Sequence, residues 1–98
     1  MNKRLVIKER AAVQLIEAAE WEELQQPGLG TRFIESWTKT VLHIEKFPRH
    51  LQKKYKSFRA ALIPGFPYVI TFEEDAHEII IFTTVHAHRK TQKRFQKK

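Results

Sequence analysis

Three short runs of β-forming residues, separated by turn signals, occupy the stretch from residue 58 to residue 89. The runs read FRAALI, FPYVITFE and EIIIFTTVH; Pro64-Gly65 separates the first two, and a polar segment from Glu74 to His77 separates the last two. Short runs rich in β-branched and aromatic residues, joined by such turns, are typical of antiparallel strands. The stretch therefore predicts a three-stranded meander that ends in a cluster of histidine and arginine side chains.

The alternation of side chains predicts how each strand lies in its sheet, because successive residues of a strand point to opposite faces. The second run is apolar on one face and mixed on the other, whereas the third run is apolar on both faces. A strand that is apolar on both faces is usually central. The apolar face of the second run comprises Phe66, Tyr68, Ile70 and Phe72, and the third run sets Ile79, Ile81 and Val85 against Ile80 and Phe82.

The residues before the meander predict a strand and a helix. A short apolar run with charged ends predicts a strand at residues 3–8. Helix-forming residues with small alanines then predict an amphipathic helix from Glu9 to Gln25, whose alanine face would let another helix approach closely. Pro27 and the two glycines after it end this helix and predict a tight connection.

A second helix is predicted from Thr31, as its N-cap, to about Phe47, just before a proline. Its apolar residues recur at spacings of four and three, so one stripe should face the sheet. The cation-rich residues 48–57 are predicted to form a loop. The predicted stripe comprises Phe33, Trp37, Val41 and Ile44.

Length and composition narrow the class of protein. A chain of 98 residues is the size of one domain, so we expect a single domain over residues 1–98, with a basic tail at about residues 90–98. The absence of cysteine excludes disulfides and thiolate chemistry. No apolar run is long enough to span a bilayer and the start does not resemble a signal peptide, so we expect a soluble, cytoplasmic protein.

The net charge of +7 is unevenly placed. Residues 1–47 hold seven basic and seven acidic side chains, whereas residues 48–98 hold eleven basic and four acidic ones. A one-sided basic field favours polyanionic partners such as nucleic acid, the ribosome surface or an acidic protein segment. The alternative interpretation is a basic tail that only solubilises the protein.

Several segments in this order resemble the toxins of the RelE/ParE superfamily of bacterial type II toxin–antitoxin modules. They are AAEWEELQQPGLGTRF, a helix ending in IEKFP, then FRAALIPGFPYVITF and a strand ending in VHAHR, together covering roughly residues 3 to 92. The resemblance implies an α+β fold: an N-terminal strand, then a two-helix hairpin packed on one face of a twisted, mainly antiparallel sheet with a C-terminal meander. It also implies neutralisation by an acidic antitoxin, as a monomer or in a small hetero-oligomer with that antitoxin.

The resemblance leaves two mechanisms open, because the superfamily has two branches. ParE-like members inhibit DNA gyrase by binding, and plasmid stabilisation is a typical role of such modules. RelE-like members are mRNA interferases, endoribonucleases that cleave messenger RNA in the ribosome. A third alternative is a non-toxic RNA-binding relative that has kept only the fold. Whether the protein is an enzyme therefore stays open, and no cofactor is expected.

The candidate site residues are cations of the meander. Arg59 matches a family arginine that holds phosphate, and His86, His88 and Arg89 lie where ribonuclease members keep catalytic side chains. Such residues suit acid–base chemistry and charge neutralisation at a phosphate, but they suit contacts with a target equally well. The pair His86 and His88 lacks further ligands in the sequence, so no metal site is expected.

One departure favours the ParE-like branch. Ribonuclease members commonly carry an arginine early in the second meander strand, followed by an apolar pair and a tyrosine. This chain has FPYVITF there, with Pro67 or Val69 at the arginine position and Phe72 in place of the tyrosine. The sequence therefore predicts a toxin that binds its target rather than one that cleaves RNA.

Overall fold

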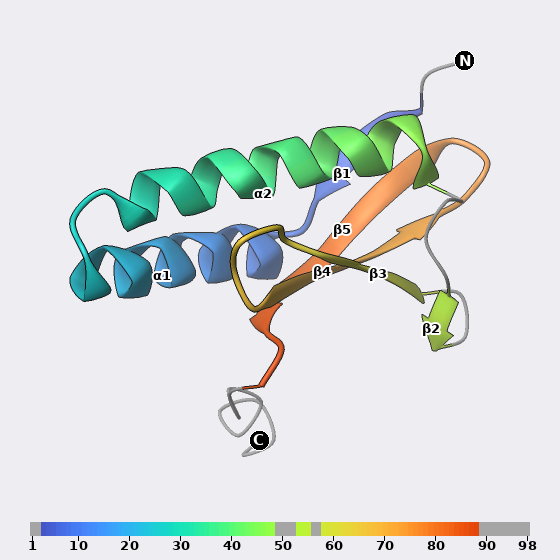
Figure 1. Ribbon diagram of the computed structural model, residues 1–98. Helices are drawn as coiled ribbons and strands as arrows, with labels where there is room; N and C mark the ends of the chain where they lie inside the picture. Colours follow the sequence, from blue (N-terminus) through green and yellow to red (C-terminus); the bar gives the residue numbers. More distant parts are fainter. Residues whose placement is uncertain (1–2, 49–52, 56–57, 89–98) are drawn as a thin grey trace.

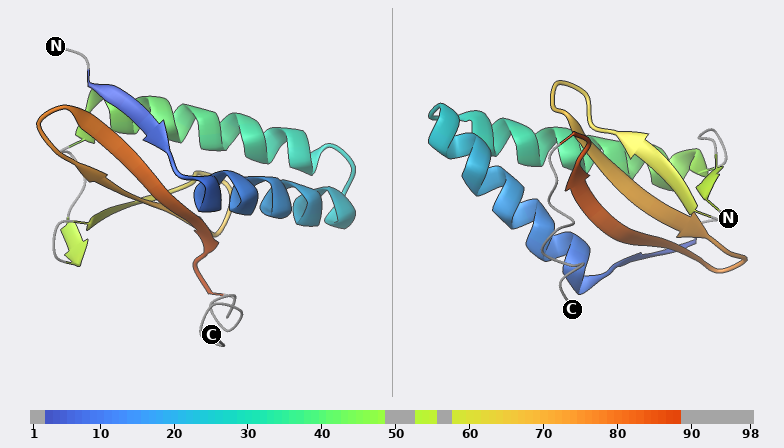
Figure 2. Two further views of the ribbon diagram at one scale, coloured as in Figure 1. Left: turned by 180° about the vertical axis from the view of Figure 1, so that it is seen from behind. Right: turned by 90° about the horizontal axis from the view of Figure 1, so that it is seen from below.

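The computed structural model has the element order β1–α1–α2–β2–β3–β4–β5, with both helices on one face of a five-stranded sheet (Figures 1 and 2). It describes residues 3–48, 53–55 and 58–88. We call the face under the helices the helix-covered face, and the other the open face. The elements are β1 (Arg4–Ile7), α1 (Glu9–Gln25), α2 (Leu29–Lys46), β2 (Lys53–Tyr55), β3 (Phe58–Leu62), β4 (Tyr68–Glu74) and β5 (Glu78–His86). The expected α+β fold class is confirmed.

The sheet has the strand order β1-β5-β4-β3-β2. Strands β2 to β5 pair antiparallel, whereas β1 pairs parallel with β5, which places the last strand of the meander inside the sheet as predicted. The loop predicted at residues 48–57 is wrong in part, because Lys53–Tyr55 form a short edge strand beside β3. Three residues with two lysines have no alternation from which a strand can be predicted.

The helix-covered face and α2 together enclose the core. The predicted stripe of α2 is buried, and so is the predicted apolar face of β4 from Tyr68 to Phe72. The ring of Phe33 lies edge-on to Tyr68, 4.8 Å between centroids, and to Phe66 at 5.1 Å. Aromatic pairs of this geometry add to the free energy gained by burial. The predicted contact of α2 with the meander is therefore confirmed.

A β-bulge in β5 corrects the predicted alternation of that strand. Thr71 pairs with Thr83 but the next residue, Phe72, pairs with Ile81, so the bulge accommodates Phe82 as an extra residue. Beyond the bulge the faces are exchanged, and Thr84 rather than Val85 is buried under the helices. The prediction that Val85 shares a face with Ile81 is therefore wrong.

The start of α2 differs from the predicted cap. Helix α2 begins at Leu29 after Gly28, whose φ of 95° lies in the left-handed region that favours glycine. The carboxylate of Glu23, on α1, accepts hydrogen bonds from the backbone N–H groups of Gly28 and Gly30 at 3.1 and 2.9 Å. The predicted N-cap role of Thr31 is wrong, because an acidic side chain from the preceding helix caps α2.

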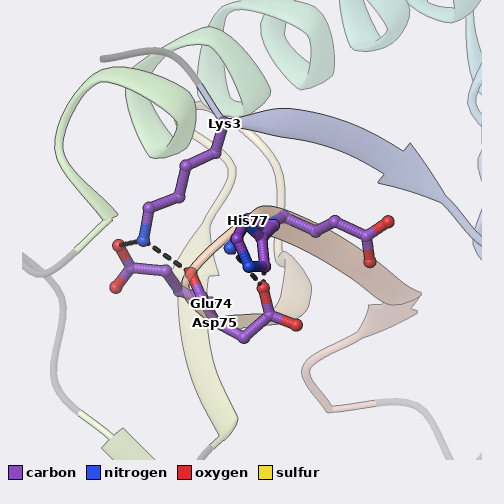
Figure 3. A network of polar contacts seen from close by, with 5 residues as sticks. Lys3, Glu74, Asp75 and His77 are labelled. Carbon is purple, nitrogen blue, oxygen red and sulfur yellow. Dashed lines mark hydrogen bonds and ion pairs between the residues drawn. The ribbon is translucent and has the colours of Figure 1, made fainter.

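The turn between β4 and β5 is held by a polar network that also fixes the start of β1 (Figure 3). Lys3 Nζ lies 2.6 Å from Glu74 Oε2 and 2.6 Å from the carbonyl oxygen of Asp75. The Asp75 carboxylate accepts hydrogen bonds from the backbone N–H groups of His77 and Glu78, both at 2.8 Å. These two bonds lower the pKa of Asp75, because they favour its charged form.

Candidate functional site

Arg59 lies near the start of β3, the strand next to the edge strand β2. It pairs with Lys53 of β2 on one side and with Phe72 of β4 on the other. Because Phe72 and Ala61 are buried on the helix-covered face, the register places Arg59 on that same face, where it is half-buried. The side chain of Arg59 therefore projects from the helix-covered face and not from the open face.

His86 is the last residue of β5 and lies on the helix-covered face, beside the start of β4. It pairs with Tyr68, and the two rings stand edge to face with centroids 5.0 Å apart. Without the bulge at Phe82, the alternation would turn His86 to the open face. The bulge thus sets which face carries this histidine, and the edge-to-face contact with the buried Tyr68 holds its ring.

His88 follows as an exposed residue just beyond β5. Its backbone N–H donates a hydrogen bond to His86 Nδ1 at 3.0 Å, so the neutral ring of His86 carries its proton on Nε2. The two imidazole centroids are 6.1 Å apart. Ala87 N–H donates to the Pro67 carbonyl at 2.7 Å, which fixes the chain at this point. Arg89, the fourth predicted site residue, lies outside the described residues.

The register separates Arg59 from the histidines. Phe72, the partner of Arg59, is four residues along β4 from Tyr68, the partner of His86. A strand rises about 3.3 Å per residue and neighbouring strands lie about 4.8 Å apart, so the two Cα atoms are about 13 Å apart along the sheet and about 10 Å apart across it. The structure brings His86 and His88 together, and it does not bring Arg59 to them.

This separation bears on the chemistry. A ribonuclease that neutralises a phosphate and moves protons at the same phosphate needs those groups within hydrogen-bond reach of it. The register places Arg59 and His86 at separate positions on the sheet and not side by side. Within the described residues, the candidate side chains therefore lie at two separate positions, Arg59 toward one end of β4 and His86 and His88 toward the other.

Two hollows lie along α2, where the sequence predicted no site. One, of about 630 Å³, is lined near the end of the helix by Lys39, His43 and Phe47 among others. The other, of about 480 Å³, runs between α2 and the β3–β4 turn and includes Arg32 and Phe66. Neither hollow is lined by Arg59, His86 or His88. The basic side chains at residues 32, 39 and 46 line these hollows and recur at every seventh residue of α2. Such spacing is common on any helix face that water covers, so the sequence did not single them out.

Other classes of site find no support in the described part of the chain. Among its residues, no group of three or more metal-binding side chains comes together. Neither helix in those residues is long and apolar enough to cross a membrane.

Comparisons with known proteins identify the fold. No protein-family model and no curated protein matches the sequence. Among solved structures, the chain is similar to one described as "Chromosomal ParDE TA system from P. aeruginosa", with a TM-score of 0.77 and 13% sequence identity. The match covers 88% of this chain and 97% of the other. The chain thus has a ParE-like fold, which confirms the architecture that the RelE/ParE resemblance implied.

Proposed function

We propose that this protein is the toxin of a bacterial type II toxin–antitoxin module and that it arrests growth by binding an essential target such as DNA gyrase. The observation that carries the proposal is the shared fold, which extends over 97% of a chain from a structure described as a ParDE TA system. The order of sequence segments that resemble RelE/ParE toxins supports the same conclusion. Both gyrase and the ribosome act in the cytoplasm, where the protein would then reside.

The separation of the candidate residues supports binding over cleavage. Arg59 is on β3 and His86 is on β5, and their partners on β4, Phe72 and Tyr68, are four residues apart. Two distant contact points suit an extended interface with a macromolecule, in which each cation contributes on its own. They do not suit a phosphoryl-transfer centre, and the strand between them lacks the arginine that ribonuclease members carry.

Charge supports an acidic antitoxin as the partner that neutralises the toxin. The chain has a net charge of +7, and the excess lies entirely in residues 48–98. Complementary charge accelerates the encounter of two proteins and suppresses wrong partners. An acidic segment that is disordered before binding could cover a large part of such a surface.

Induced expression in a bacterial host tests the toxin. Growth should stop within a few generations, and co-expression of its antitoxin, which we expect to be a small acidic protein encoded beside this gene, should restore it. The control is a variant with a disrupted core, Phe33→Asp, at matched protein levels. Normal growth at a verified level of the folded protein would contradict the proposal.

A second experiment identifies the target class. Purified protein should inhibit DNA supercoiling by gyrase, and messenger RNA isolated after induction should stay intact. Messenger 5′ ends that appear in phase with the reading frame, and that vanish in the Arg59→Ala and His86→Ala variants, would instead establish the ribosome-dependent nuclease.

A further inference from the structure

Helix α1 carries apolar side chains on the side that faces solvent as well as on the side that faces the sheet. Its buried face is made of small residues, with Ala11, Ala18 and Ala19 in the core. Its outward side carries four large apolar residues, which we call the outer stripe. The outer stripe comprises Val13, Ile16, Trp21 and Leu24, with exposed fractions of 44%, 56%, 46% and 81%.

The outer stripe lies on one side of the helix. At 100° per residue its four side chains fall within an arc of about 140° on the helix surface, opposite the buried alanines. In Figure 2, α1 lies at the edge of the molecule, with α2 and the sheet on its inner side. A helix that is apolar on all sides is normally buried, and an exposed apolar band marks a surface that another molecule covers.

The charges around the outer stripe select the chemistry of its partner. Residues 13–24 contain four glutamates and neither lysine nor arginine. Two of them, Glu17 and Glu20, are exposed and lie within the arc of the outer stripe. The same side of α1 also carries the exposed pair Glu9 and Arg10, whose charges cancel, so this side of the helix is acidic although the chain as a whole carries a net charge of +7.

A second copy of the chain fits the outer stripe poorly. A two-fold axis through its centre would set Val13 against Leu24 of the other copy and Ile16 against Trp21. The same axis would set Glu17 against Glu20 of the other copy, twice. Like charges held opposite one another in an interface are unfavourable, so the acidic residues oppose this pairing.

From this arrangement we infer that the outer stripe is a docking surface for a basic amphipathic helix of another protein. Leucine-like side chains of that helix would cover Ile16 and Leu24, and its lysines or arginines would face Glu17 and Glu20. The surface is distinct from the basic half of the chain, which draws acidic partners. It stands whether or not the protein is a toxin.

Two synthetic peptides test the inference on the intact protein. Both are helical peptides of about 18 residues with leucine on one face; the other face carries lysine in one peptide and glutamate in the other. Trp21 is half-exposed whereas Trp37 is buried, so a blue shift of tryptophan emission reports on the outer stripe. The shift should be absent in Trp21→Phe.

The lysine peptide should bind at least tenfold more tightly than the glutamate peptide. The variants Ile16→Ser/Leu24→Ser and Glu17→Lys/Glu20→Lys should each weaken its binding about tenfold, because one removes apolar contact and the other turns attraction into repulsion. The matched control is Leu42→Ser/Leu62→Ser, two exposed apolar residues on other elements, which should bind as the wild type does.

Three outcomes of the peptide experiment would overturn the inference. These are equal affinity for the two peptides, no binding of the lysine peptide at millimolar concentration, and loss of binding in the Leu42→Ser/Leu62→Ser control instead. Sedimentation equilibrium adds a further check, since a dimer of the free protein that Ile16→Ser/Leu24→Ser abolishes would assign the outer stripe to a second copy. Circular dichroism of each variant verifies that it is folded.

Discussion

The indole Nε1–H of Trp37 donates a hydrogen bond to the hydroxyl oxygen of Thr84, 3.0 Å away, inside the layer between α2 and β5. The same hydroxyl donates to the carbonyl of Ala11 at 3.3 Å, and the backbone N–H of Thr84 donates to Gln14 Oε1 at 2.9 Å. Thr84 thus joins both helices to β5 at the point where β5 extends beyond β1. It occupies this place only because the bulge turns it inward.

The first prediction concerns this hydroxyl. Thr84→Val keeps the shape of the side chain but leaves the buried indole N–H without its acceptor, so the free energy of unfolding should fall by about 1–3 kcal/mol. The control is Thr83→Val, which loses a bond to Thr71 on the open face, where water can replace it. Chemical denaturation measures both, and equal losses would contradict the assigned role of the buried bond.

The second prediction tests the close approach of the two helices. A Cβ at Gly30 would lie 2.8 Å from the backbone oxygen of Ala19. Alanine is the better helix former by about 1 kcal/mol, so an unhindered Gly30→Ala would stabilise the protein. We expect the opposite sign, with a loss of about 1–2 kcal/mol from overpacking. A higher thermal midpoint of Gly30→Ala would show that the helices can separate without cost.

The third prediction compares two candidate caps of α2. Glu23→Ala removes the acceptor for the N–H groups of Gly28 and Gly30 and should cost about 1 kcal/mol of unfolding free energy. Thr31→Ala should be within about 0.5 kcal/mol of the wild type, because Thr31 lies inside the helix and is exposed. Urea denaturation of both variants decides between the caps, and the reverse order would restore the cap predicted from the sequence.

The fourth prediction concerns acid. The pKa of Asp75 is lowered from its ordinary value of 3.8 by the N–H groups of His77 and Glu78. A lowered pKa in the folded state means that the contribution of Asp75 to stability is complete above the unfolded pKa and is lost as the pH falls through the folded pKa. Asp75→Ala should therefore destabilise at neutral pH and lose that effect in strong acid.

Denaturation midpoints of the wild type and Asp75→Ala across the acid range check this dependence. Asp75→Asn serves as the control, because its amide oxygen can accept the same two hydrogen bonds without titrating in this range. A difference between wild type and Asp75→Ala that stays constant from neutral pH to strong acid would contradict the prediction.

The fifth prediction follows from the distance between Arg59 and His86. If the two contribute separately to one binding interface, the effects of Arg59→Ala and His86→Ala on target affinity should add in the double variant. Members of a catalytic unit behave otherwise, since removing one costs about as much as removing all. Affinities of the four proteins for purified gyrase give the answer, and a double variant no weaker than the worse single one would indicate a shared site.

Sequence reasoning succeeded where the signal is local and periodic. The bounds of α1 and the buried stripe of α2 around Trp37 follow from composition and a 3.6-residue period. The apolar face of β4 follows from strict alternation, and the central place of β5 from its two apolar faces. Each of these signals lies within the residues of one element, and the contacts between elements agree with it.

The misses all depend on contacts between elements. The bulge at Phe82 exists only in the pairing of β5 with β4, and the cap from Glu23 reaches α2 from another helix. The edge strand β2 is defined by its partner β3 rather than by its own three residues. The same applies to the candidate site. Arginine and histidine are both residue types that a nuclease uses, and only the pairing of β3 and β5 with β4 shows that Arg59 and His86 are not neighbours.

The parallel pairing of β1 with β5 has a consequence for how the protein is made. Arg4 and its ion-pair partner Glu78 are 74 residues apart in the chain. The strand that pairs with β1 is β5, the last strand of the chain that the structure describes. A nascent chain leaving the ribosome therefore presents β1 and α1 before β5, the strand with which β1 pairs. The sheet closes only when β5 has been synthesised, so the surfaces of a partly translated chain are unlike those of the finished protein.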